Sequence, residues 1–135
     1  MTYLLDTNVV SELRKPKPHG AVVAWVAAQP AAGLHICALT IGEIQSGIEL
    51  TRRQDTAKAD EIEAWLEQLV TTNDILPIDA ETFRIWANIT VRQSEALFED
   101  ALLAACAKRH NLTVATRNVK HFKDFGVPVF NPFNA

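Results

Sequence analysis

The chain of 135 residues is 48% hydrophobic and 21% charged, which is typical of one globular domain that buries a core without disulfides. Its net charge of −3 argues against a protein that coats nucleic acid through bulk positive charge. It does not argue against an enzyme that cuts nucleic acid, because metal ions bring positive charge into an acidic site.

The apolar pattern alternates between short strands and longer helices along the whole chain. In chain order it predicts a strand at 3–5, helices at 8–13 and 21–29, a strand at 34–38, helices at 40–52 and 57–70, a strand at 75–78, helices at 80–93 and 100–109, and strands at 113–116 and 127–130. The helix at 57–70 is the clearest, because Ile62, Leu66 and Leu69 recur on one face. Asn111 follows the last long helix, where a left-handed residue commonly ends a helix.

Residues 1–135 contain no internal repeat and only one short linker-like stretch, at 15–18, so a single domain is expected. No apolar run reaches the roughly eighteen residues of a membrane helix, and no basic segment precedes the first apolar run. We therefore expect neither a membrane span nor a signal peptide. Cys37 and Cys106 are interpreted as reduced core residues, which fits a cytoplasmic protein.

Strands separated by helices predict a parallel sheet with helices on both faces. In such sheets ligands bind beyond the carboxyl ends of the strands. Several acids occupy these positions. Asp6 ends the first strand, Glu43 lies one helical turn after the second, Asp79 ends the third, and Asp100 opens the helix that leads into the fourth. We expect several of these carboxylates to converge on one edge of the sheet.

Each acid also has a purely structural interpretation. Thr40 and Glu43 match a capping box, and Asp79 and Asp100 are candidate helix N-caps. Asp6 is a candidate acceptor for the backbone N–H of residue 8 or 9. Capping does not require an acid where serine or threonine would serve, however, and three carboxylates held close together repel one another unless a cation joins them.

Oxygen ligands without a His or Cys cluster favour Mg²⁺ or Mn²⁺ over Zn²⁺. The four histidines show no ligand spacing and are interpreted as surface or partly buried residues. An acidic cluster that holds Mg²⁺ is typical of phosphoryl-transfer chemistry.

Four motifs follow one another along the chain: Leu4-Leu-Asp-Thr-Asn8, Thr40-Ile-Gly-Glu-Ile44 with Gly47, Glu99-Asp-Ala-Leu-Leu-Ala-Ala105, and Ala115-Thr-Arg-Asn118. In this order and spacing they resemble the PIN-domain ribonucleases, in particular the bacterial VapC toxins and their FitB-like branch. The closing Phe130-Asn-Pro-Phe133 is similar to that branch, so the resemblance covers essentially the whole chain.

The resemblance implies a three-layer α/β/α fold around a central parallel sheet. It implies Mg²⁺- or Mn²⁺-dependent cleavage of RNA by the toxin of a type II toxin–antitoxin pair. It also implies a homodimer and a cognate antitoxin that covers the acidic site. It matches Asp6, Glu43 and Asp100 to the three core acids of the family, and it gives Asp79 no such role.

On this basis Asp6 and Asp100 are expected to ligate the metal, while Glu43 holds a water molecule and helps to deprotonate it. The chain departs from the family at the fourth acid, because Asn118 and His121 occupy its usual positions. We therefore expect one firmly held metal ion and a weaker second.

Supporting roles are expected from three polar residues. Asn8 fixes the rotamer of Asp6, while Thr116 and Asn118 position water or a phosphate oxygen.

Basic residues near the motifs are candidates to guide the RNA backbone. Arg117 and Lys120 flank Asn118, Arg14 follows the first helix, and Arg52 ends the third. The alternative for each is a solubility charge; Arg117 is the strongest candidate because it lies inside the motif.

Two other functions remain open. One is a catalytically weak or inactive PIN-fold module that binds RNA or protein, suggested by the missing fourth acid. The other is a phosphoacceptor receiver domain, which also gathers aspartates at strand ends. A receiver domain carries two adjacent acids after its first strand, however, and only Asp6 is present there.

Overall fold

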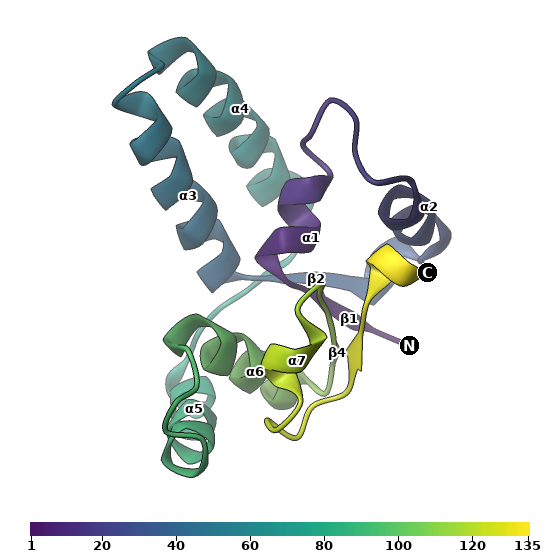
Figure 1. Ribbon diagram of the computed structural model, residues 1–135, viewed down its shortest axis with the longest axis vertical. Helices are drawn as coiled ribbons and strands as arrows, with labels where there is room; N and C mark the ends of the chain where they lie inside the picture. Colours follow the sequence, from purple (N-terminus) through teal and green to yellow (C-terminus); the bar gives the residue numbers. More distant parts are fainter.

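The computed structural model describes all 135 residues, and five short strands form one parallel sheet (Figure 1). The strands are β1 (Tyr3–Leu5), β2 (Leu34–Cys37), β3 (Ile75–Leu76), β4 (Thr113–Ala115) and β5 (Val129–Phe130), and they lie in the order β3-β2-β1-β4-β5. All neighbouring strands pair in parallel. Leu5 pairs with Ala115, so β1 and β4 end side by side.

Helices cover both faces of the sheet (Figure 1). One layer contains α1 (Thr7–Glu12), α2 (Gly20–Ala28), α3 (Ala38–Arg52) and α4 (Thr56–Thr72). The other contains α5 (Ala80–Arg92), α6 (Phe98–His110) and the short α7 (Val119–Phe122). Two 3₁₀ turns, Ala31–Gly33 and Pro132–Asn134, complete the chain. The predicted α/β/α architecture is therefore confirmed.

The two apolar cores lie on opposite faces of the sheet because side chains alternate along a strand. Tyr3 and Leu5 belong to the core beneath α1 to α4, while Leu4, fully buried, belongs to the core beneath α5 and α6. Trp25 packs edge-on against Tyr3 with 4.8 Å between ring centroids. Burial on both faces explains why β1 reads as a continuous apolar run that ends abruptly at Asp6.

The helix boundaries change the interpretation of two acids. The helix α3 begins at Ala38, two residues earlier than predicted, so Thr40 lies inside the helix. The helix α6 begins at Phe98, so Asp100 lies within its first turn. The expected stop at Asn111 is confirmed, because its φ of 58° is left-handed and its N–H bonds the last turn.

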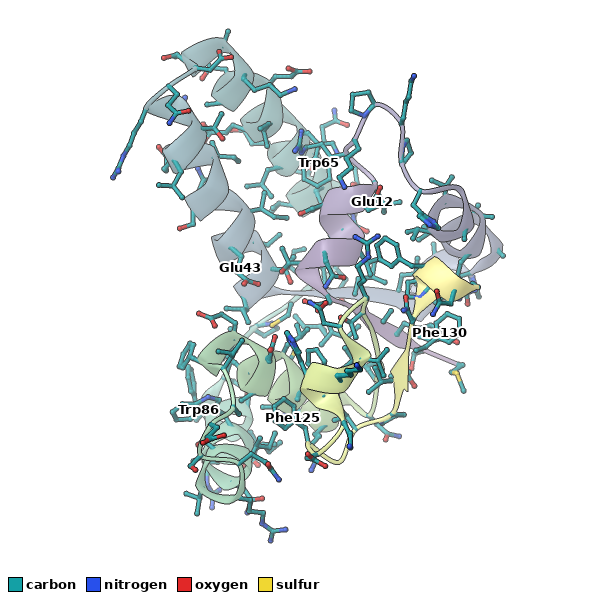
Figure 2. All side chains as sticks on the ribbon, viewed as in Figure 1. Glu12, Glu43, Trp65, Trp86, Phe125 and Phe130 are labelled. Atoms are coloured by element: carbon teal, nitrogen blue, oxygen red, sulfur yellow. The ribbon has the colours of Figure 1, made fainter.

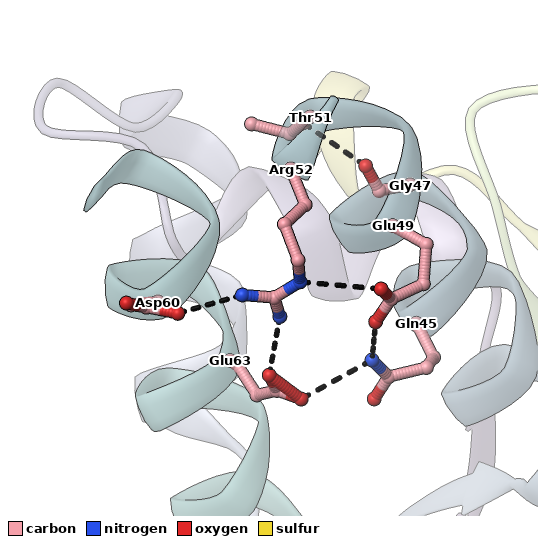
Figure 3. A network of polar contacts seen from close by, with 7 residues as sticks. All are labelled: Gln45, Gly47, Glu49, Thr51, Arg52, Asp60 and Glu63. Carbon is pink, nitrogen blue, oxygen red and sulfur yellow. Dashed lines mark hydrogen bonds and ion pairs between the residues drawn. The ribbon is translucent and has the colours of Figure 1, made fainter. Parts of the chain in front are cut away.

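The α3–α4 hairpin is joined by Arg52 (Figure 3). Its guanidinium bonds Glu49 on its own helix and reaches Asp60 and Glu63 on α4. Gln45 extends this network with a 2.7 Å bond to Glu49. Since every side of the guanidinium meets a carboxylate, Arg52 has an interhelical role in place of the RNA contact considered from the sequence.

Cys37 and Cys106 are free and buried, as expected. None of the helices combines the length and the apolar composition needed to cross a bilayer.

Candidate functional site

Asp6 lies where β1 ends and α1 begins, and three donors hold its carboxylate. The backbone N–H of Thr7 donates to Oδ1 at 2.7 Å, and the Thr116 hydroxyl and the Asn8 amide donate to Oδ2 at 2.7 and 3.1 Å. A helix N-cap accepts from the second or third helical N–H, so the bond to adjacent Thr7 is not a standard cap. With about four acceptor positions on a carboxylate, Oδ1 retains room for one more partner.

The loop after β4 is tied to the same carboxylate. The buried Thr116 hydroxyl, which donates to Asp6, accepts the backbone N–H of Asn118 at 3.0 Å. Asn8 bridges the two segments, because its side-chain oxygen accepts the backbone N–H of Arg117 at 3.2 Å. The structure thus brings Asp6, Asn8 and Thr116 into one hydrogen-bonded unit.

Glu43 reaches this unit from α3. Its Oε1 accepts the Thr7 hydroxyl at 2.6 Å, and the same hydroxyl lies 3.1 Å from that of Thr40. A capping box requires Thr40 at the N-cap, but Cys37 holds that position, so the capping-box interpretation is wrong. Burial raises the pKa of the Glu43 carboxyl, and the charges of Asp6 and Asp100 raise it further, against the lowering effect of the Thr7 bond.

Asp100 approaches the same edge of the sheet from α6. Leu97 is the N-cap of that helix, so the alternative interpretation of Asp100 as an N-cap is wrong. Its side chain is 18% exposed, and Oδ2 lies 3.1 Å from Nδ1 of His121. Burial raises the pKa of Asp100; His121 opposes this effect, while the charges of Asp6 and Glu99 reinforce it.

Two site residues were not assigned a role from the sequence. Glu99 adds a fourth negative charge that raises the pKa values of Glu43 and Asp100. Its position directly before Asp100 was the available sequence signal. Thr7 links Asp6 to Glu43, and its position between Asp6 and Asn8 in the first motif was the corresponding signal.

Asp79 does not join the cluster. Its Oδ1 accepts both the N–H and the hydroxyl of Thr82, at 2.9 and 2.8 Å, and so caps α5. These hydrogen bonds lower the pKa of Asp79. The structural interpretation of this acid is confirmed.

The donor chemistry of the site suits a hard cation, because its charged groups are carboxylates, and the charge of Asp6 raises the pKa of both Glu43 and Asp100. No three Asp, Glu, His or Cys side chains stand close enough together to form a ready-made metal cage. Mg²⁺ is usually held by one or two carboxylates and several waters, so Asp6 and Asp100 fit such an ion without a cage.

The basic candidates line two different cavities. Arg117 and Lys120 line an open cavity of about 500 Å³ together with Asn118 and His121. The Arg117 guanidinium stacks 4.2 Å from the centroid of Phe133, which holds it in place. No hydrogen bond joins the Asn118 side chain to the carboxylates, so this residue lies at the rim.

Arg14 lies apart from that cavity. It lines a second one, between α1 and α3, in which Glu43 is also exposed.

Comparison with known proteins extends over nearly the whole chain. The model of the PIN domain family matches residues 3–127. The chain is 36% identical to Toxin FitB of Neisseria gonorrhoeae over 138 aligned positions, covering 97% of this chain and 98% of that protein. It is 30% identical to VapC ribonuclease Y4jK of Sinorhizobium fredii, with 96% of each chain covered.

Solved structures give the same picture. The crystal structure of FitAcB from Neisseria gonorrhoeae includes a chain with a TM-score of 0.90 and 35% identity, covering 99% of this chain and 100% of that one. DNA-bound VapBC2 of Rickettsia felis includes a chain with a TM-score of 0.82, but at 20% identity this likeness concerns the fold alone.

Proposed function

The chain belongs to the PIN-domain family, and from that premise we propose that it is an endoribonuclease and the toxin of a type II toxin–antitoxin pair. Relatives that align along their full lengths are named a toxin and a ribonuclease. The observation that carries the proposal is the convergence of Asp6, Glu43 and Asp100 on one edge of the sheet, where the charges of the other two acids raise the pKa of Glu43.

The residues divide the chemistry among themselves. Asp6 and Asp100 would hold Mg²⁺ or Mn²⁺, which would neutralise the scissile phosphate and acidify the attacking water. Glu43 orients this water and accepts its proton at Oε2, since Oε1 already accepts the Thr7 hydroxyl. Thr116 and Asn8 keep the Asp6 carboxylate in one orientation.

The substrate and the partners follow from the same family. RNA is the substrate, and Arg117, Lys120 and Arg14 line two cavities along which its backbone approaches. A cognate antitoxin covers the acidic edge; a related solved structure, 26% identical to this chain, is a toxin–antitoxin complex from Klebsiella pneumoniae. The chain forms a homodimer and acts in the cytoplasm, where Cys37 and Cys106 stay reduced.

A second candidate is a PIN-fold module that binds RNA or protein without cutting. It is favoured by Asn118 and His121 at the positions of a fourth acid. Family membership excludes the receiver-domain alternative.

RNA cleavage by the purified protein, with Mg²⁺ or Mn²⁺ and then with chelator, tests the proposal. We expect cleavage only with metal, and a loss of at least roughly 100-fold in Asp6→Asn, Glu43→Gln and Asp100→Asn. Asp55→Asn is the matched control, because Asp55 caps α4 through Lys58 and asparagine caps equally well. RNA binding without cleavage under every ion would support the inactive module instead.

A further inference from the structure

A groove leads away from Glu43 along α1. A cavity of about 210 Å³ lies between α1, α3 and α4, with Glu43 and Thr7 in its wall. A second cavity of about 160 Å³ shares Arg14, Ile62 and Trp65 with the first and therefore continues it toward Lys58. Figure 2 shows the two ends of this path, with Glu43 at the sheet end of α3 and Trp65 on α4 beside α1.

Arg14 stands in the middle of this groove without a protein partner. It is half-buried, yet none of the ion pairs or side-chain hydrogen bonds of the structure includes it. Arg52, by contrast, meets three carboxylates. Because no carboxylate of the protein neutralises this guanidinium, it is free to bind an anion, and its planar fork fits a phosphate.

Trp65 differs from the other two tryptophans. Trp25 packs against Tyr3, and Trp86 packs against Phe98, whereas no aromatic ring pairs with Trp65. The Trp65 side chain is partly buried against the core, and it also lines both cavities. An aromatic ring open to a groove is a platform on which any nucleobase stacks.

We infer that this groove is the nucleotide subsite next to the scissile bond, in which Arg14 binds an RNA phosphate and Trp65 stacks the adjoining base. The inference rests on the proposed function and deepens it. An RNA chain that is cut beside Glu43 extends on both sides of the scissile bond. This groove begins at Glu43, which lines its first cavity. Ser11 adds a hydroxyl along the same path, and Thr51, whose hydroxyl already donates to the Gly47 carbonyl, adds an acceptor oxygen. Ile44, Ile48 and Ile62 also line the first cavity, but an apolar peptide segment would leave the Arg14 guanidinium and the hydroxyls without partners, so the lining favours RNA.

The stacking is tested by removing the bases of the RNA and the ring of Trp65, first separately and then together. The probes are a short labelled adenosine oligoribonucleotide and an abasic ribose-phosphate chain of equal length, and both are bound to Asp6→Asn so that no cleavage occurs. In that background the loss of the bases is expected to weaken binding roughly tenfold. With Trp65→Leu added, the loss of the bases is expected to cost almost nothing, because the stacking partner is already absent.

Arg14→Gln tests the phosphate contact. It is expected to weaken both probes to a similar extent and to flatten the dependence of affinity on salt. Arg84→Gln is the matched control, because that arginine is 80% exposed on α5 and touches only Glu81. Trp86→Leu is the control for Trp65→Leu, because Trp86 pairs with aromatic rings away from the groove.

The outcomes separate the two levels of the proposal. Equal affinity of Asp6→Asn for both probes, or additive losses when the bases and the ring are both removed, overturns the inference. An unchanged RNA affinity in Arg14→Gln and Trp65→Leu, combined with weaker binding of the antitoxin, would assign the groove to that protein and also overturn it. Neither result affects the proposed function, which fails only if wild-type protein does not cut RNA with any divalent metal.

Because Trp65→Leu also removes core packing, quenching of tryptophan emission by the oligonucleotide in a Trp86→Leu background provides a second test in which Trp65 is intact. Absence of that quenching contradicts the inference.

Discussion

The hydroxyl of Thr7 donates a 2.6 Å hydrogen bond to Oε1 of Glu43, across 36 positions of the sequence. The bond joins α1 to α3 and holds the carboxylate beside Asp6. It also lowers the pKa of Glu43 against the raising effect of burial. Thr7 therefore adjusts both the position and the ionisation of the proposed base.

Thr7→Val is expected to shift the pH dependence of cleavage. Without the hydroxyl, the pKa of Glu43 rises further, so a smaller fraction of the base is ionised at a given pH. The rising limb of the pH–rate profile should move to higher pH, with a loss of about tenfold on that acidic limb for a bond worth about 1.4 kcal/mol. Thr7→Ser keeps the hydroxyl and should retain the wild-type profile. A profile unchanged in Thr7→Val would show that Thr7 does not act through Glu43.

Glu43→Gln is expected to raise stability in chelator while it abolishes cleavage. The pKa of Glu43 is raised above its ordinary value of 4.5 in the folded protein. Between that ordinary value and the raised one, the folded state holds a proton that the unfolded state has released. The free energy of unfolding therefore falls as pH rises through this window, and it stays lower above it.

Glutamine removes this penalty and still accepts the Thr7 hydroxyl. Thermal melts in chelator should show the variant above wild type by a few degrees at neutral pH, but not at pH values below the ordinary pKa. Added Mg²⁺ or Mn²⁺ should stabilise wild type more than the variant. A variant that melts below wild type at neutral pH would contradict this account.

Asp79→Ala is expected to lower the melting temperature by about 4 °C with no change in cleavage, because the residue caps α5. The pKa of Asp79 is lowered, so its carboxylate stabilises the fold above the ordinary value of 3.8, and the effect is lost as pH falls through the lower folded value. Melts of both proteins should therefore converge in acid. Asp79→Ser, which keeps a capping oxygen, is the control. Reduced cleavage in that variant would show that Asp79 takes part in the site.

Substitution of Arg117 and substitution of Arg52 should have different effects on RNA binding and on stability. Arg117→Gln is expected to weaken RNA binding and reduce its salt dependence, because Arg117 lines the cavity beside Asn118. Arg52→Gln is expected to lower the melting temperature but leave RNA affinity unchanged, because its guanidinium is occupied between α3 and α4. Titrations of labelled RNA at several salt concentrations, with parallel thermal melts, measure both. If Arg52→Gln weakened RNA binding and Arg117→Gln lowered only the melting temperature, the assignment of the two arginines would be wrong.

The proposed homodimer should appear in light scattering at micromolar concentration as twice the monomer mass. Phe83 and Phe98 leave aromatic surface exposed on α5 and α6, where a partner subunit can cover it. Phe83→Glu is expected to shift the protein toward monomer, while Phe83→Leu should not. A wild-type monomer at that concentration would contradict the dimer.

The sequence by itself determined the order of strands and helices and the acids at the strand ends. These features follow from local rules. A buried parallel strand is apolar on both faces, so β1 is visible as a run that stops at Asp6. Local geometry also determined the cap at Asp79 and the left-handed stop at Asn111, since each depends on neighbours within a few residues.

The tertiary structure decided what the other acids do. Glu43 matched a capping box in sequence, but the start of α3 at Ala38 excluded that role, and its partner is Thr7 on another helix. Arg52 and Arg14 look alike in sequence, yet one is surrounded by carboxylates and the other faces an open groove. Contacts between residues so far apart depend on how helices pack across the sheet, and a pattern of neighbouring residues carries no record of that packing.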